Sequence, residues 1–216
     1  MNQDQIKQLN EAVEAVKTRK IENVYFVACG GSKAIFDPAQ FIFDRETTLP
    51  SFVYNANEFI HRCPKGLGEN SLVVTCSHSG NTLETTRATQ LAGDKGALTI
   101  SFSYRVDSPL WKATQHPISY VWGPESNPGD NNNGMLYRLV FSILNVLQPN
   151  EKYERAIKAC DNLGKVYEAN KAKFAESAKA FGKKYKNNKL IYTMSSGPCY
   201  GVAYSFAICL LQEMQW

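Results

Sequence analysis

Residues 73–86 change from an apolar run into a short turn and then into a helical pattern. The apolar run is typical of a buried strand, and the turn that follows is rich in hydroxyl groups. These small residues are Ser77, Ser79, Gly80 and Thr82. A strand that gives way to a helix across so short a turn is the unit from which parallel sheets are built. This stretch therefore favours an α/β fold.

Strand patterns recur along the first 122 residues, with helical or loop patterns between them. They lie at residues 24–29, 51–55, 71–76, 97–103 and 117–122. The alternation predicts a three-layer αβα fold with a five-stranded, parallel, flavodoxin-like sheet in the order 2-1-3-4-5. In that order the first and third strands are neighbours whose connections cross opposite faces. We expect ligands to bind in the crevice at their carboxyl ends.

A second turn of this kind follows the first strand, where Cys29 leads into Gly30, Gly31 and Ser32. A helix start attracts a dianion through its backbone amides, and the serine and threonine hydroxyls can add uncharged donors. Both turns are expected to open into the same crevice and to hold a phosphate without a metal. A serine-rich turn that only caps a helix would look similar. The turn at Gly30, Gly31 and Ser32 is neither a Walker loop nor a complete dinucleotide fingerprint.

Composition disfavours several other functions. The six cysteines show no C-x-x-C spacing and only three histidines are present, so we expect no metal, no cofactor and a reducing cytoplasm. The net charge is +4, and the lysines of residues 152–189 are mixed with acidic residues, which indicates a solvated helical face and no nucleic-acid partner. No segment has the apolar length of a membrane span, and the polar start is no signal peptide.

Residues 188–198 repeat the pattern of residues 22–32: a polar entry, a buried strand, a turn of small residues and then an apolar helix. We therefore expect a first domain over residues 1–149, a helical connection over 150–187, and the start of a second, similar domain over 188–216. An apolar helix that ends on Trp216 without a cap indicates a truncated chain. The single strand of the second half would pair with another chain, dock on the first sheet or be poorly ordered.

Three motifs and the duplicated architecture together resemble the sugar isomerase (SIS) family of phosphosugar-binding proteins. The motifs are Cys29-Gly30-Gly31-Ser32, Ser77-His78-Ser79-Gly80-Asn81-Thr82 and Asp107-Ser108-Pro109-Leu110. Within that family the chain is most similar, along nearly its whole length, to deglycases of glycated amino-acid 6-phosphates, including the fructose-asparagine type. The phosphate turn is specific for the family and much less so for the substrate.

The resemblance implies roles for individual residues. It assigns the sugar phosphate to hydroxyls and backbone around the two turns, namely Ser77, His78 (through its backbone), Ser79, Thr82, Gly31 and Ser32. It assigns an acid/base role to Glu213, near the end of the last helix. The family's partner histidine, in a later His-Gly-Pro motif, does not occur in this chain, so we expect binding without turnover. The resemblance also implies a homodimer or higher homo-oligomer with sites completed across the interface.

Several residues keep alternative interpretations. From the residues alone, a glutamate near a helix end, such as Glu213, is usually solvated and not catalytic. His78 lies between two serines, which suggests a general base, but its place in a phosphate turn favours a structural or backbone role. Asp107 is expected to cap a helix ahead of Ser108 and Pro109. Residues 127–133 are expected to form a loop on the ligand side of the sheet, either closing over substrate or lying on the surface.

Three classes of function stay open. The first is an enzyme that acts on 6-phosphorylated ketosamines (Amadori products) and releases glucose 6-phosphate and an amino acid by proton transfer between C1 and C2. The second is a ketose-aldose phosphosugar isomerase or the isomerase half of glucosamine 6-phosphate synthase, although Leu210 stands where that synthase has a lysine. The third is a non-catalytic phosphosugar sensor. In each case the ligand is a phosphorylated sugar or sugar-amine.

Overall fold

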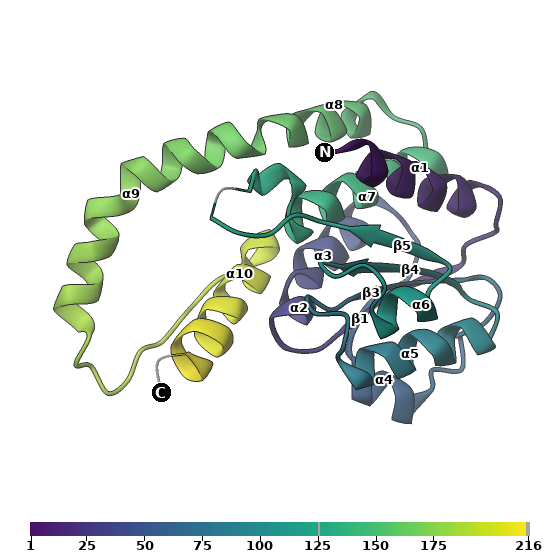
Figure 1. Ribbon diagram of the computed structural model, residues 1–216, viewed down its shortest axis with the longest axis horizontal. Coiled ribbons are helices and arrows are strands. Elements are labelled where there is room, and N and C mark those ends of the chain that lie inside the picture. Colours follow the sequence, from purple (N-terminus) through teal and green to yellow (C-terminus); the bar gives the residue numbers. More distant parts are fainter. Residues whose placement is uncertain (125, 215–216) are drawn as a thin grey trace.

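Figure 1 presents a computed structural model of the protein, which describes residues 1–124 and 126–214. Its centre is a sheet of five parallel strands, paired in the order β2-β1-β3-β4-β5. The strands are β1 (Asn23–Ala28), β2 (Ser51–Asn55), β3 (Ser71–Cys76), β4 (Leu98–Ser103) and β5 (His116–Ser119). The predicted fold class and strand order are confirmed.

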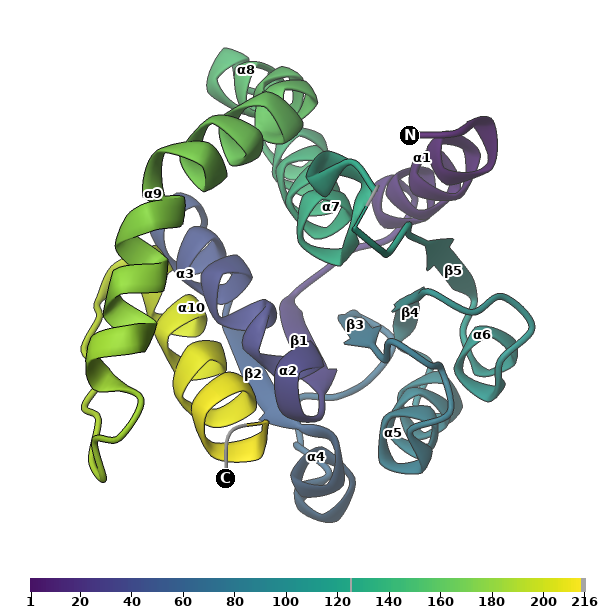
Figure 2. The same cartoon turned by 60° about the vertical axis from the view of Figure 1, so that its left-hand side comes forward.

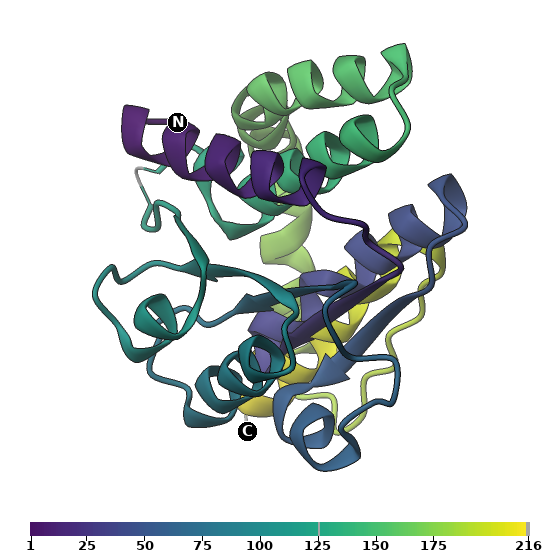
Figure 3. The same ribbon diagram turned by 90° about the vertical axis from the view of Figure 1, so that its right-hand side faces the viewer.

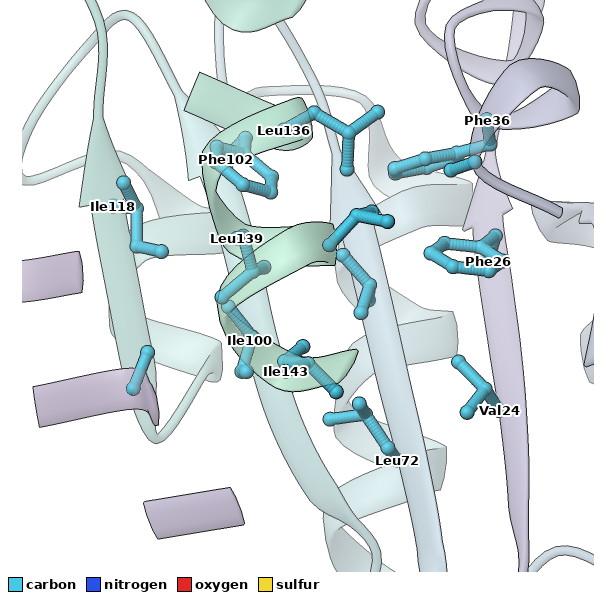
Figure 4. Close-up of a cluster of buried hydrophobic side chains, with 14 of the residues drawn as sticks. Val24, Phe26, Phe36, Leu72, Ile100, Phe102, Ile118, Leu136, Leu139 and Ile143 are labelled. Carbon is cyan, nitrogen blue, oxygen red and sulfur yellow. The ribbon is translucent and has the colours of Figure 1, made fainter. Parts of the chain in front are cut away.

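Helices cover both faces of the sheet. Side chains of a strand alternate between faces, so β1 turns Val24 and Phe26 to one side and Tyr25 and Val27 to the other. One face packs against α1 (Gln3–Lys17), α3 (Phe36–Glu46) and α7 (Asn132–Leu147), and the other against α4 (Ala56–Arg62) and α5 (Leu83–Asp94). Figure 3 shows α1 in purple above the sheet, and Figure 4 shows α7 packed over the strand side chains.

The connections between strands create a switch point at β1 and β3. From β1 the chain passes through α2 (Gly30–Ala34) and α3 on one face, whereas from β3 it passes through α5 on the other. Because β1 and β3 are neighbours, their carboxyl ends border a crevice between diverging connections. The two glycine-serine turns follow these two ends.

The short helix α6 (Pro109–Ala113) follows β4 and corrects one prediction. Its N-cap is Ser108, whose Oγ accepts a hydrogen bond from the amide of Trp111 at 3.3 Å. Asp107 was predicted to cap this helix, but it has a left-handed backbone with φ of 61° and lies outside the cap. Pro109 occupies the first turn, as expected from its fixed φ and its lack of an amide hydrogen.

The remainder of the described chain, residues 151–214, is called the C-terminal arm below. It contains α8 (Glu151–Ala159), η2 (Cys160–Asn162), α9 (Leu163–Tyr185), η3 (Gly197–Cys199), α10 (Tyr200–Ser205) and the π-helical segment η4 (Phe206–Glu213). Helix α9 extends away from the sheet, and the chain returns so that α10 lies beside α2 and α3 (Figures 1 and 2). Residues 215–216 of the predicted last helix lie outside the described residues.

The strand predicted at the start of the second half is not formed. Residues 190–196 form neither a helix nor a strand, and Leu190, Ile191 and Tyr192 are exposed. A strand is stable only when a neighbour pairs with its backbone, and within the described residues the five-stranded sheet ends at β2 and β5. The segment therefore does not dock on the first sheet, and its pairing with another chain stays a prediction.

The sequence analysis also predicted that no segment spans a membrane. Within residues 1–124 and 126–214, none of the helices is both long and apolar enough to cross a membrane.

Candidate functional site at the switch point

The two glycine-serine turns leave the sheet side by side. Ala28 of β1 pairs with Cys76 of β3, so Gly30 and Ser77 begin their turns at neighbouring points of the same edge. The Ser32 side chain lies close enough to the thiol of Cys76 to lower its pKa. Burial nevertheless raises the pKa of Cys76 to about 12, so this cysteine stays a neutral thiol and joins the turns structurally.

Hydroxyl groups converge within the turn formed by residues 77–82. The Oγ of Ser77 lies 2.8 Å from the Oγ1 of Thr82 and accepts a hydrogen bond from the amide of Gly80 at 3.1 Å. The Oγ of Ser79 accepts one from the amide of Asn81 at 3.2 Å. Thr82 is the N-cap of α5, and its hydroxyl faces Ser77. Hydroxyls and the positive end of a helix are therefore concentrated in one short segment.

Gly80 is required by the shape of this turn. Its φ is +66°, in the left-handed region, and a side chain there would overlap Ser108 and come within 2.8 Å of the Ser103 Oγ. The carbonyl of Gly80 accepts a hydrogen bond from the amide of Leu110 at 3.0 Å. The segment after β4 thus supports the turn from behind and explains why only a glycine fits there.

The His78 side chain projects into a cluster of aromatic rings. It stacks on Tyr104 with ring centroids 5.2 Å apart and meets Trp122 edge-on at 5.0 Å. Its Nδ1 shares a hydrogen bond of 3.0 Å with the hydroxyl of Tyr120. Partial burial lowers the pKa of His78, and the nearby charge of Arg105 lowers it further. The imidazole is therefore mainly neutral at pH 7.

This aromatic cluster was missed at the level of the sequence. Tyr104 follows β4, and Tyr120 and Trp122 follow β5. Residues that follow parallel strands gather at one edge of the sheet, so their positions could have indicated that they meet. Burial raises the pKa of Tyr120 well above its ordinary value, and the neighbouring Cys76 adds to the effect. The Tyr120 hydroxyl therefore keeps its proton and can donate it to neutral His78.

Glu213 lies at the end of η4, and its side chain is exposed. The same helical segment touches the first turn, because a side chain on Gly31 would meet the Cys209 Sγ at 3.4 Å. Leu210 and Ala34 line a common cavity of about 240 Å³. The segment that carries Glu213 therefore packs on α2, while the carboxylate itself faces solvent.

Residues 127–133, predicted as a loop on the ligand side, contain the short helix η1 (Pro128–Asp130) and the start of α7. Asn127 caps η1 by accepting a hydrogen bond from the amide of Gly129 at 2.9 Å. Asn131 caps α7 through the amide of Gly134 at 3.0 Å. The segment follows β5 and so continues from the edge that carries the two turns. Two successive caps hold its backbone in place.

Comparison with known proteins identifies the class. A family model described as the SIS domain matches residues 17–147, and the chain belongs to this family. It is 47% identical over 211 residues to fructosamine deglycase FrlB of Bacillus subtilis (strain 168), covering 97% of this chain and 64% of that protein. It is 28% identical to fructoselysine 6-phosphate deglycase of Escherichia coli (strain K12), covering 94% of this chain and 59% of that protein.

A solved structure from Bacillus subtilis, described as a proposed phosphosugar isomerase, has the same fold. It superposes with a TM-score of 0.94 at 47% identity, covering 97% of this chain and 64% of that one. The resemblance seen in the sequence motifs is thereby confirmed at the level of the family and of similarity to the deglycases. The chain spans 64% and 59% of the lengths of the two relatives.

Proposed function

We propose that the protein of which these residues are part is an enzyme that acts on 6-phosphorylated ketosamines. The observation that carries the proposal is the cradle of hydroxyls at residues 77–82, which leads into the start of α5 at the β1/β3 switch point beside the Gly31-Ser32 turn. In this proposal Ser77, Ser79 and Thr82 bind the phosphate through their hydroxyls, together with the backbone of His78. Gly31 and Ser32 bind the facing side of the phosphosugar.

The proposed acid/base group is Glu213. Its helical segment packs against α2 at Gly31, which supports a position on the sugar side of the cradle. An exposed carboxylate in an open site can be covered by substrate, and it needs only to reach C1 and C2 of an open-chain ketose. The phosphate, held at the other end of the chain, limits how the substrate can turn.

The chemistry requires one proton shift and one hydrolysis. A base removes a proton from C1, which lies between the amine and the C2 carbonyl, and an enaminol forms as the carbonyl oxygen takes a proton. Returning a proton to C2 while the nitrogen loses its own gives an imine at C1. Water then adds to the imine and releases glucose 6-phosphate and the free amino acid. The overall reaction consumes one water.

The relatives support this choice. One is named a fructosamine deglycase and the other a fructoselysine 6-phosphate deglycase, and the chain aligns with each over more than nine tenths of its length. A ketose-aldose isomerase would use the same proton shift without the amine. It is the second candidate, because the solved structure that superposes on the chain is described as a proposed phosphosugar isomerase.

The phosphate cradle is tested by binding of glucose 6-phosphate, measured by calorimetry. Ser79→Ala and Thr82→Val each remove a hydroxyl from the cradle and are expected to weaken binding about tenfold or more, as for a lost hydrogen bond to a charged group. Ser177→Ala, in the exposed α9, removes a hydroxyl elsewhere and is expected to leave binding unchanged. Equal affinity in all variants would refute the cradle.

The reaction is tested in the natural protein that contains these residues. It is mixed with 6-phosphofructosyl amino acids, and the release of glucose 6-phosphate and amino acid is followed by mass spectrometry. Release that is lost in Glu213→Gln is the expected result. Interconversion of plain hexose 6-phosphates without release would favour the isomerase. Phosphosugar binding with neither reaction would leave a sensor.

We also propose a homodimer or higher homo-oligomer, a cytoplasmic location, and a second domain that begins at about residue 188. The apolar side chains exposed along the C-terminal arm support further contacts of that region, and the six free cysteines suit a reducing compartment. Mass measured by light scattering tests the oligomer.

A further inference from the structure

A large cavity lies outside the residues assigned to phosphate and proton transfer. It has a volume of about 820 Å³ and is formed by the segment after β5, the first turns of α7 and one side of α9. Its lining combines three aromatic rings with two amides and one ammonium group: Trp122, Tyr137, Tyr167, Asn133, Asn170 and Lys171. Its volume falls within the range of small-molecule sites.

Two contacts link the lining of the cavity to the surroundings of the proposed site. First, Trp122 is in contact with His78, a residue of the phosphate turn, with ring centroids 5.0 Å apart. Second, Asn133 and Tyr137 also line the cavity of about 240 Å³ whose other wall includes Leu210. Leu210 lies three residues before Glu213. One lining residue of the large cavity therefore contacts the turn at residues 77–82, and two others also line the smaller cavity beside the helical segment proposed for proton transfer.

The geometry of the substrate places its amino-acid part at this location. In a 6-phosphorylated ketosamine the phosphate is on C6 and the amine is on C1, at opposite ends of the carbon chain. If C6 is held at residues 77–82 and C1 lies by Glu213, the group attached to the amine projects away from the turn. The large cavity is a concave surface that borders this position.

The lining suits an amino acid attached through its nitrogen. Such a group carries a free carboxylate and a side chain, and Lys171 offers an exposed ammonium whose Nζ lies 5.8 Å from the ring centroid of Tyr167. Helix α9 contains six lysines and two glutamates, so its charge favours an anion. The aromatic faces can pack on apolar side chains, and the amides can hydrogen-bond.

We propose that this cavity binds the amino-acid part of the ketosamine, with Lys171 holding its carboxylate and Tyr167 packing on its side chain. The inference rests on the proposed function, since it assumes the positions of C6 and C1. It assigns discrimination between substrates to α9, a helix that lies outside the sheet and its turns.

The test compares two ligands that share the phosphate, the sugar carbons and the amine. One is 6-phosphofructosyl-leucine, and the other is 1-amino-1-deoxyfructose 6-phosphate, which has no amino-acid part. Dissociation constants are measured by calorimetry with the Glu213→Gln chain, so that turnover cannot consume ligand. We expect the leucine conjugate to bind about tenfold more tightly, as for one good charged or aromatic contact.

Tyr167→Ala and Lys171→Met are each expected to reduce this ratio severalfold without changing the affinity for the smaller ligand. Phe174→Ala and Lys173→Met are the matched controls, because they remove an exposed ring and an exposed ammonium from the same helix outside the cavity lining. They are expected to keep the full ratio. Circular dichroism of all four variants checks that α9 still folds.

Two results would overturn the inference. The first is equal affinity for the two ligands in the chain with Tyr167 and Lys171 unchanged. The second is a ratio of the two dissociation constants that does not change in Tyr167→Ala and Lys171→Met. A different result would refute the proposed function. In that case 1-amino-1-deoxyfructose 6-phosphate would not bind, or it would bind equally well to Ser79→Ala. Failure of the phosphate cradle refutes both proposals, whereas a lost or insensitive ratio with an intact cradle refutes only the cavity assignment.

Discussion

The sheet region, residues 1–150, and the C-terminal arm, residues 151–214, use similar apolar side chains in opposite ways. In the sheet region Phe26 is 1% exposed, packed between strands and helices, whereas Phe174 of α9 is 53% exposed. Every residue of α9 is half-buried or exposed along its 23 positions. The sheet region is thus stabilised by its own core, while α9 depends on local helical hydrogen bonds and side-chain pairs.

The sheet region has a core of its own, whereas the C-terminal arm depends on contacts with other parts of the protein. The arm is fixed at its two ends. Near its start, Arg138 of α7 pairs with Asp161 at 2.8 Å. Near its end, Gly201 of α10 packs closely on Ala34 and Pro38. Between these points several of its apolar side chains, including Phe174 and Phe181, are exposed, which suits a surface that binds something further.

The largest expected effect comes from two matched substitutions, one in the core of the sheet region and one in the C-terminal arm. Phe26→Ala removes a ring from the core, and we expect it to lower the free energy of unfolding by about 3–5 kcal/mol through lost burial and the cavity left behind. Phe174→Ala removes a phenyl ring from the surface of α9 and should change the free energy of unfolding by less than about 0.5 kcal/mol. Urea unfolding followed by fluorescence and circular dichroism measures both. A large effect of Phe174→Ala would show that α9 belongs to the cooperative core.

The same contrast explains what could be predicted from the sequence. The five strands and their order were predictable because the central strands β1 and β3 are apolar and buried on both faces, and because helical or loop patterns separate the five strand patterns. The turn at residues 77–82 was predictable because hydroxyls and glycine interrupt an apolar run. The strand near residue 190 is not formed within the described residues, because its apolar pattern resembles that of β1 but its pairing depends on a neighbour, which one segment cannot specify; pairing with another chain stays a prediction.

The directions of the side chains in the candidate site were harder to predict from the sequence than the strands were. The sequence places His78 in the turn at residues 77–82, but its contacts with Tyr104 and Trp122 arise from how β4 and β5 end at one edge. The position of Glu213 beside α2 depends on the return of the chain after α9, a long-range contact with no local signal. Its role came from family resemblance and stays a proposal.

A second pair of substitutions compares the backbone conformation of two glycines, one in the sheet region and one in the C-terminal arm. Gly80→Ala forces a side chain into a left-handed position against Ser108, so we expect the sheet region to lose about 1–3 kcal/mol of stability. Gly182→Ala lies in α9 with open space around it and should stabilise that helix by roughly 0.5–1 kcal/mol. Thermal unfolding and the helical signal at 222 nm measure the two effects.

The two glycines should therefore respond with opposite signs. Gly80→Ala should also weaken binding of glucose 6-phosphate, because the turn that holds the hydroxyls must move. Gly182→Ala should leave binding unchanged. If Gly80→Ala kept both stability and binding, the left-handed turn would not be required for the cradle.

The smallest expected effect is a dependence on pH that is confined to the sheet region. All three histidines lie there, and none lies in the C-terminal arm. Partial burial and Arg105 lower the pKa of His78, and burial together with Arg19 lowers that of His116 against an opposing effect of Glu11. Their folded pKa values therefore lie below the ordinary value of about 6.5.

The sign of the effect follows from proton binding. Between the folded and unfolded pKa values the unfolded chain binds more protons, so the free energy of unfolding rises with pH in that interval. The stabilisation is complete above about pH 6.5 and is lost as the pH falls through 6.5 toward the folded values. Since His78 is largely exposed, we expect its share to be only roughly a few tenths of a kcal/mol.

Unfolding in urea at pH 7.5, 6.5 and 5.5 measures this loss, and His78→Gln isolates one residue. The difference between the unsubstituted chain and His78→Gln should change over this interval, because the variant lacks the proton that the unfolded chain takes up. Other titrating groups, including Asp37 with its raised pKa, cancel in that difference. A constant difference would mean that the ring has an ordinary pKa and that the aromatic cluster does not hold it neutral. The helical signal of α9, which has no histidine, should stay unchanged over the same range.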